Sequence, residues 1–175
     1  MKRFALLSYF VLQLSVLVVP AQDHPFYMYG EIWDMDTRYI LVNSSVKATN
    51  INDTAIVIWG RVDDKGRFDL ELPFDHSFKV EFNAPGYISK HALVDLNGVA
   101  PNRRQGDHGM NVQAALIKPL ADVDYSPFAE HAFGSCQLNS KGRSFEWDKE
   151  YSARSQAEFQ PTLDQHNERR KALED

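Results

Sequence analysis

A strict alternation of apolar and charged residues in the segment Gly66–Pro73 limits most strongly what this chain can fold into. Phe68, Leu70 and Leu72 fall on one face of an extended segment, and charged residues fall on the other. A period of two is typical of a β-strand with one buried face and one solvated face. Residues 78–82 repeat the pattern after a short turn. The two segments are therefore predicted to form an antiparallel hairpin.

Similar short segments recur about every ten residues along the first two-thirds of the chain. The pattern predicts further strands at residues 28–33, 39–49, 56–59, 87–94 and 110–117. The run 56–59 is continuously apolar, so it is predicted to be buried on both faces, with Trp59 in the core. About seven strands without helices between them predict a mainly β fold, an antiparallel Ig-like sandwich or a barrel. Parallel βαβ architecture is excluded because crossover helices are missing.

Beyond the last of these strands the alternation stops. One short strand is predicted at residues 134–138, and Asp148 is predicted to cap a short helix that Pro161 interrupts. The expected organisation is a sandwich domain, residues 22–120, followed by a C-terminal extension, residues 121–175, that is partly helical or disordered.

The first residues of the chain have the features of a secretory signal peptide, in the usual order. Lys2 and Arg3 precede an uncharged, mainly apolar run that ends at Val19, and the small residue Ala21 follows. This order predicts a signal peptide, residues 1–21, and an exported protein that is periplasmic, on the outer surface or secreted. A permanent membrane anchor is the alternative, and it needs about 20 apolar residues. After cleavage, no integral membrane segment is expected.

The charge of the chain excludes nucleic acid as a partner. There are 19 basic and 24 acidic residues, for a net charge of −5. Removing residues 1–21 takes away two basic residues and no acidic one, which changes the net charge to −7. An acidic protein of this kind is expected to repel phosphate backbones.

The sequence contains no motif for catalysis, for a cofactor or for a metal. The six histidines lack zinc-site spacing, and neither a hydrolase elbow nor a phosphate-binding glycine loop is present. An enzyme would require His91, Asp107 and His108 to converge in one cleft. The acid pairs Asp34–Asp36 and Asp63–Asp64 are possible calcium ligands, but they match no EF-hand loop. We therefore predict no enzymatic activity, no cofactor and no metal site.

The single cysteine, Cys136, excludes an internal disulfide framework. In an oxidising compartment this residue is predicted to be buried as a small apolar side chain. A free accessible thiol and a bridge to another chain are the alternatives.

The candidate ligand-contacting residues are aromatic and basic. Trp33 and Tyr87 are predicted to offer a stacking surface for a sugar or a peptide, because aromatic rings present large contact faces. Arg103 and Arg104 lie in the polar loop 97–109, which is expected, together with the edge strands, to form a contact surface.

The central part of the chain resembles a known domain family. Residues 60–73 read GRVDDKGRFDLELP, and they are followed by FKVEF at 78–82 and APGYISK at 84–90. This order resembles the carboxypeptidase regulatory-like domain, a transthyretin-like β-sandwich with an Asp/Gly turn, an alternating strand and a Pro-Gly-Tyr corner. The resemblance covers residues 27–95. It implies a seven-stranded accessory domain of an exported protein and does not imply a specific activity.

A second resemblance concerns the segment Phe145–Tyr151. It is similar to the Phe-x-x-Asp-x-x-Tyr tail of small exported proteins of Bacteroidota, although their Pro-Val/Ile-Gly-Lys-Ile segment is replaced here by residues 132–136. This origin implies that Asp53-Thr54-Ala55 is a short O-glycosylation sequon with Thr54 as the acceptor.

Together these features predict a non-enzymatic, exported cell-envelope module with a binding or structural role. Its expected partner is an envelope protein or a glycan. The alternative is a carbohydrate-binding or peptidase-accessory module that uses the aromatic surface at Trp33 or Tyr87.

Overall fold

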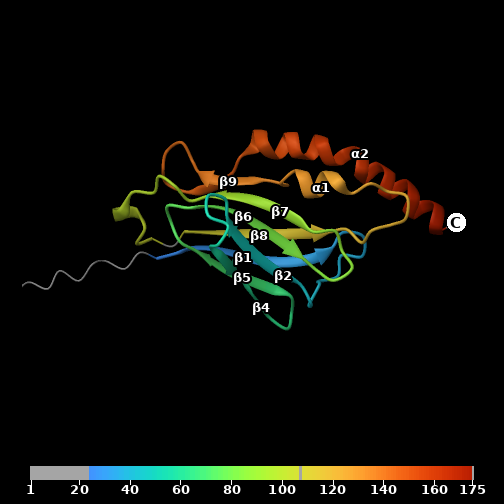
Figure 1. Cartoon of the computed structure of the whole chain (residues 1–175), viewed down its shortest axis with the longest axis horizontal. Coiled ribbons are helices and arrows are strands. Elements are labelled where there is room, and N and C mark those ends of the chain that lie inside the picture. Colours follow the sequence, from blue (N-terminus) through green and yellow to red (C-terminus); the bar gives the residue numbers. More distant parts are fainter. Residues whose placement is uncertain (1–23, 107, 175) are drawn as a thin grey trace, which may run out of the picture.

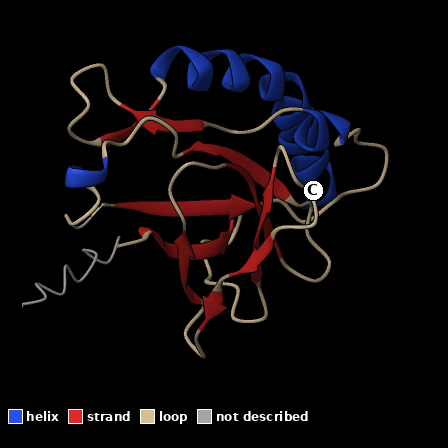
Figure 2. Cartoon of the chain, turned by 60° about the vertical axis from the view of Figure 1, so that its left-hand side comes forward, coloured by secondary structure: helices blue, strands red, loops and turns tan. Residues whose placement is uncertain are grey.

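The chain folds into two β-sheets packed face to face (Figure 1). The computed structural model describes residues 24–106 and 108–174. Figure 2 shows that the two longer helices gather on one side of the strands. The mainly β sandwich that the alternation predicts is thereby confirmed.

The strands divide into a smaller and a larger sheet. The smaller sheet consists of β1 (Phe26–Asp34), β4 (Arg61–Val62), β5 (Arg67–Leu72) and β8 (Gly109–Leu116). The larger sheet consists of β2 (Ser45–Asn50), β3 (Val57–Trp59), β6 (Ser77–Asn83), β7 (Lys90–Asp95), β9 (Ser135–Leu138) and β10 (Phe145–Trp147). The helical segments are the 3-10 turn η1 (Pro101–Arg103), α1 (Ser126–Glu130) and α2 (Lys149–Glu174).

The strand order differs from the expected set of seven antiparallel strands. The smaller sheet runs β4-β5-β1-β8 and the larger runs β10-β9-β7-β6-β2-β3. Two neighbouring pairs are parallel, β1 with β8 and β7 with β9. Beyond residue 120 the chain adds β9 and β10 to the larger sheet, and Cys136 of β9 belongs to the core. The sequence pattern of these late strands is too short and too irregular to reveal their place in the sheet.

The expected hairpin between residues 66–73 and 78–82 is wrong. β5 pairs with β1 and β4 in the smaller sheet, whereas β6 pairs with β2 and β7 in the larger one. Both strands turn their apolar faces to the same core, and the connection between them passes from one sheet to the other. A period of two identifies the buried face of a strand but not its sheet. The turn before β5 does join it to β4, with Gly66 at φ +74°.

The core is formed by the alternate residues of both sheets. Three strands, β1, β5 and β6, and the connection after β7 contribute fully buried side chains: Phe26, Met28, Ile32, Leu72, Phe78, Val80, Phe82 and Leu96. Burying each large apolar side chain stabilises the fold by about 1.5–3 kcal/mol. The alternation in β5 and β6 is therefore the clearest sign of this core in the sequence.

Two expectations about the apolar residues next to β2 are wrong. Trp59, which was expected in the core, is 63% exposed. It lies on the three-residue edge strand β3, where Val57 and Trp59 face outward and only Ile58 packs against the core. Ile40 and Val42 precede β2 and are exposed instead of continuing its buried face. A run of apolar residues does not by itself distinguish a central strand from an edge strand.

Helix α2 is continuous across Pro161, where an interruption was expected. Its start agrees with the prediction, because Asp148 accepts a hydrogen bond from the backbone amide of Tyr151 at 2.9 Å. The residues buried along one side of α2 are Ser155, Phe159, Thr162 and His166. Three of these four are polar, so the usual apolar stripe of a surface helix is nearly missing.

The predicted signal peptide, residues 1–21, lies outside the described residues and stays a prediction. In the parts of the chain that are described, no helix is both long and apolar enough to cross a bilayer.

Cys136 is a free cysteine with a fully buried side chain, and burial raises the pKa of its thiol to about 12. We therefore predict that the native protein does not react with Ellman's reagent at pH 8, because the thiolate is the reacting species. One equivalent should react after unfolding in guanidinium. The exposed position Thr54, replaced in a Thr54→Cys variant, provides the control for a reactive thiol. Equal rates for the native protein and this variant would contradict the burial of Cys136.

Candidate functional site

The outer face of β1 carries a row of aromatic side chains. Alternate residues of a strand point to the same face, which places Tyr27, Tyr29 and Trp33 on the side of the smaller sheet that faces away from the core. Tyr27 is 37% exposed and Tyr29 is 47% exposed, while Trp33 is half-buried. At the usual rise of a strand, the row extends over about 20 Å.

Hydrogen-bonding side chains flank this row on both neighbouring strands. Tyr27 lies opposite Glu71 and Tyr29 opposite Asp69 on β5, and Tyr29 also lies beside Asn111 on β8. A cavity of about 430 Å³ opens at this face, lined by the two tyrosines and Asp69. The face thus combines exposed rings with carboxylate and amide groups.

The close packing of β8 against β1 depends on Gly30, which follows Tyr29 in β1 and has the parity of the inward-facing residues. Gly30 adopts φ +152°, and a Cβ atom at this position would lie 1.8 Å from the carbonyl oxygen of Val112. A side chain here would push β8 away from β1. Gly30 therefore holds Asn111 beside Tyr29.

Trp33, one of the predicted stacking residues, lies at the end of the row. The guanidinium carbon of Arg38 is 4.4 Å from the centroid of the Trp33 ring. The indole Nε1 is buried and has no hydrogen-bond partner among the described residues. One face of this ring is therefore covered by the protein itself.

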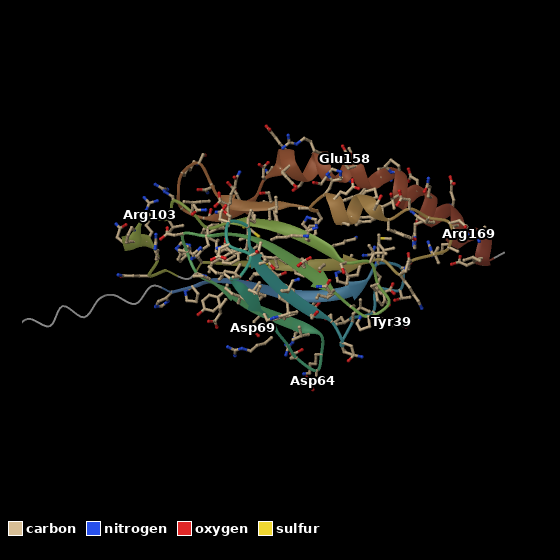
Figure 3. All side chains as sticks on the ribbon, viewed as in Figure 1. Tyr39, Asp64, Asp69, Arg103, Glu158 and Arg169 are labelled. Atoms are coloured by element: carbon tan, nitrogen blue, oxygen red, sulfur yellow. The ribbon has the colours of Figure 1, made fainter. Side chains whose placement is uncertain are left out.

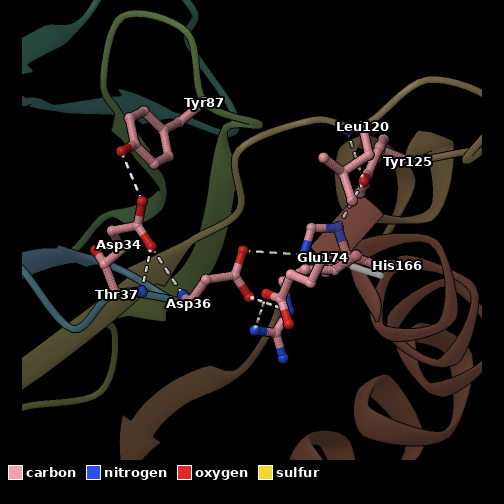
Figure 4. A network of polar contacts seen from close by, with 9 residues as sticks. Asp34, Asp36, Thr37, Tyr87, Leu120, Tyr125, His166 and Glu174 are labelled. Carbon is pink, nitrogen blue, oxygen red and sulfur yellow. Dashed lines mark hydrogen bonds and ion pairs between the residues drawn. The ribbon is translucent and has the colours of Figure 1, made fainter. Parts of the chain in front are cut away.

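Tyr87, the other predicted stacking residue, lies in the turn between β6 and β7 and belongs to a different surface. Its hydroxyl donates a hydrogen bond to Oδ2 of Asp34 at 2.7 Å (Figure 4). Oδ1 of Asp34 accepts hydrogen bonds from the backbone amides of Asp36 and Thr37, both at 2.8 Å. Burial raises the pKa of Asp34, but these hydrogen bonds outweigh it and hold the pKa below its usual value.

The network continues from this turn to the C-terminal helix (Figure 4). Oδ2 of Asp36 lies 3.0 Å from Nε2 of His166, which is fully buried, and Nδ1 of His166 lies 2.8 Å from the hydroxyl of Tyr125. The same hydroxyl accepts a hydrogen bond from the amide of Leu120. Every donor has an acceptor if Tyr125 donates to Nδ1 and Nε2–H donates to Asp36. The arrangement fastens α2 to the turn after β1.

Arg103 lies at the opposite end of the sandwich from Tyr39 (Figure 3), and Arg104 is the next residue in the chain. Arg103 donates a hydrogen bond to the carbonyl of Gly142, and Arg104 forms an ion pair of 2.7 Å with Asp75. These contacts connect loops to each other. The structure does not bring the two arginines beside the predicted aromatic residues.

The histidines considered for catalysis have different surroundings. His91 is buried on β7 next to α1, where its backbone carbonyl accepts a hydrogen bond from Phe133. His108 lies 2.6 Å from the carbonyl of Arg103 and packs on the rings of Phe74 and Phe145. Asp107 lies outside the described residues. His91 and His108 are not brought together.

The acid pairs considered as calcium ligands take part in turns. Oδ1 of Asp63 accepts hydrogen bonds from the amides of Lys65 and Arg67, both at 2.9 Å. Over residues 24–106 and 108–174, no group of three or more His, Cys, Asp or Glu is placed to hold a metal ion.

Thr54, the predicted glycosylation acceptor, is exposed in the turn before β3. The turn is closed by a hydrogen bond from the amide of Ile56 to the carbonyl of Asp53. Its modification stays a prediction.

Tyr27 and Tyr29 were missed by the sequence reasoning, which selected only Trp33 from this strand. The signal was present, because the three aromatic residues share one parity in an alternating segment.

Comparison with known proteins gives no family assignment. No protein-family model matches the chain, and no curated protein matches it in sequence. Among solved structures, a membrane-associated protein of unknown function from Bacteroides fragilis aligns at 20% identity with a TM-score of 0.39, over 57% of this chain and 30% of its own. A 3-chlorocatechol 1,2-dioxygenase from Rhodococcus opacus aligns at 14% identity with a TM-score of 0.41, over 56% of this chain and 62% of its own.

A protein from Bacteroides uniformis described as a candidate carbohydrate-binding protein aligns at 13% identity with a TM-score of 0.34, over 67% of this chain and 49% of its own. The chain thus spans less than two-thirds of each of these proteins. Likenesses at this level support no functional conclusion.

Proposed function

We propose that this protein is a non-enzymatic, exported binding module of the cell envelope that holds a carbohydrate chain against the outer face of the smaller sheet. The observation that carries the proposal is the row of Tyr27, Tyr29 and Trp33 between hydrogen-bonding side chains of β5 and β8. The predicted signal peptide and the resemblance of residues 27–95 to an accessory domain of exported proteins support it.

The chemistry of the row suits a glycan. Sugar rings have C–H faces that pack on aromatic rings, and their hydroxyls pair with carboxylate and amide groups. Asp69, Glu71 and Asn111 supply such groups on the neighbouring strands. An open row about 20 Å long suits an extended chain better than a single small molecule. Binding at this face needs no chemical step by the protein.

We predict that a Tyr29→Ala variant binds glycans about tenfold more weakly than the wild type, because one stacked ring contributes about 1.5 kcal/mol. A glycan array identifies the ligand, and titration calorimetry then measures the affinity of each variant. The Tyr27→Ala/Tyr29→Ala double variant should lose binding further.

Trp59→Ala is the matched control, because it removes an exposed aromatic ring from the other sheet. It should bind like the wild type. Loss of binding in this variant alone would place the contact surface at the β3 edge instead. An array without any bound glycan would contradict the proposed ligand class.

A further inference from the structure

A second cavity lies on the larger sheet, apart from the aromatic row. It measures about 370 Å³ and is lined by residues of β6, of the segment that leads into β7, and of α1 with its flanking residue. Its cations are Lys79 and Lys90, and its aromatic walls are Tyr87, Tyr125 and Phe128. The lining thus combines ammonium groups with aromatic rings.

Lys90 is the central cation of this cavity. Its side chain is half-buried, and its Nζ lies 4.8 Å from the centroid of the Phe128 ring. Over residues 24–106 and 108–174, no carboxylate forms an ion pair with this nitrogen. Burial lowers the pKa of Lys90 to about 8. Charged side chains that leave water are normally paired, so an ammonium without a carboxylate is unusual.

The side chains that line the cavity carry more lysines than carboxylates, in contrast to the chain as a whole. Glu81 is the one carboxylate among the lining residues, and it is already bound by Lys47 at 2.7 Å and by Lys79 at 3.4 Å. The protein as a whole has a net charge of −5. A local excess of lysine over carboxylate at this place favours an anionic ligand.

Two of the aromatic walls, Tyr87 and Tyr125, are held in position by the buried polar network. The hydroxyl of Tyr87 is bound to Asp34 at 2.7 Å, and that of Tyr125 lies 2.8 Å from His166 (Figure 4). Both hydroxyls are therefore used within the protein, and the rings are left to contact a ligand through carbon. Walls that are fixed before binding reduce the entropy cost of association.

We propose that this cavity binds a small carboxylate-bearing molecule about the size of one sugar ring. Its carboxylate pairs with the ammonium of Lys90, and its ring packs against Tyr87 and Tyr125. The volume lies at the lower end of the range for small-molecule sites, which is about 300–1,000 Å³. The inference rests on this cavity alone and does not depend on the proposed glycan surface.

The test is a calorimetric titration of the purified protein with galacturonate, galactose and acetate. Galacturonate has both the ring and the carboxylate, whereas galactose lacks the charge and acetate lacks the ring. We expect saturable binding of galacturonate, weaker binding of acetate and none of galactose. Lys90→Met should weaken galacturonate binding about tenfold or more, because a charge-assisted contact is lost. Tyr29→Ala should leave it unchanged, which separates this site from the proposed glycan surface.

A second measurement shows that the Lys90→Met variant is folded. Methionine keeps the alkyl chain and removes a partly buried charge that has no carboxylate partner, so the variant should melt at a temperature equal to or higher than that of the wild type. Equal binding of galactose and galacturonate, or unchanged affinity in Lys90→Met, would overturn the proposal. So would a failure of galacturonate and acetate to bind at millimolar concentration.

Discussion

Replacing His166 with alanine should lower the free energy of unfolding by about 3–4 kcal/mol, the range for a buried side chain whose loss leaves both a cavity and unpaired polar groups. His166 is fully buried and lies within hydrogen-bond distance of Asp36 and Tyr125. Without the imidazole, the hydroxyl of Tyr125 and the carboxylate of Asp36 each lose a partner. Urea denaturation followed by circular dichroism measures the change.

His131→Ala is the matched control, because His131 is exposed and lies just after α1. Its effect should stay within about 0.5 kcal/mol. A double-mutant cycle with Asp36→Ala should give a coupling energy of about 1 kcal/mol or more, since the two side chains are in contact. If His166→Ala is no more destabilising than His131→Ala, the network does not fasten α2 to the turn after β1.

The sequence alone identified the buried faces of the sandwich but not the way the strands assemble. Phe68 and Leu70 of β5, like Phe78 and Val80 of β6, are buried as their alternation predicts. The predicted pairing of β5 with β6 was wrong, because the pattern of a strand shows which side is apolar but not which strand it pairs with. The prediction that Trp59 is buried was wrong for a related reason, since the sequence of an apolar edge strand resembles that of a central strand.

The site residues were predicted only where the signal is local. Trp33 could be selected as an aromatic residue on an alternating strand, and the same parity would have given Tyr27 and Tyr29. The contact of Asp36 with His166 joins residues 130 positions apart, and no local pattern records it. The surroundings of Lys90 could not be predicted either, because they depend on Phe128 of α1, which only the fold brings beside β7.

The stability that Asp34 provides should depend on pH in the acid range. Asp34 is 5% exposed, and hydrogen bonds from Tyr87 and from the turn amides of Asp36 and Thr37 lower its pKa from 3.8 in spite of burial. Because the pKa of Asp34 is lower in the folded state, the stability that its carboxylate provides is present above pH 3.8. This stability is lost as the pH falls through the lower pKa of the folded protein.

An Asp34→Asn variant isolates this contribution from the other carboxylates, which titrate equally in both proteins. Its amide nitrogen cannot accept the hydrogen bond of Tyr87, so at pH 7 the variant should be about 2 kcal/mol less stable than the wild type. That gap should shrink as the pH falls below 3.8 and through the lower pKa of the folded wild type, which then loses its own carboxylate charge. Urea denaturation at each pH measures the gap, and the exposed Asp64→Asn variant is the control, with no gap at any pH. A gap that stays constant down to pH 2 would show that the charge of Asp34 does not stabilise the turn.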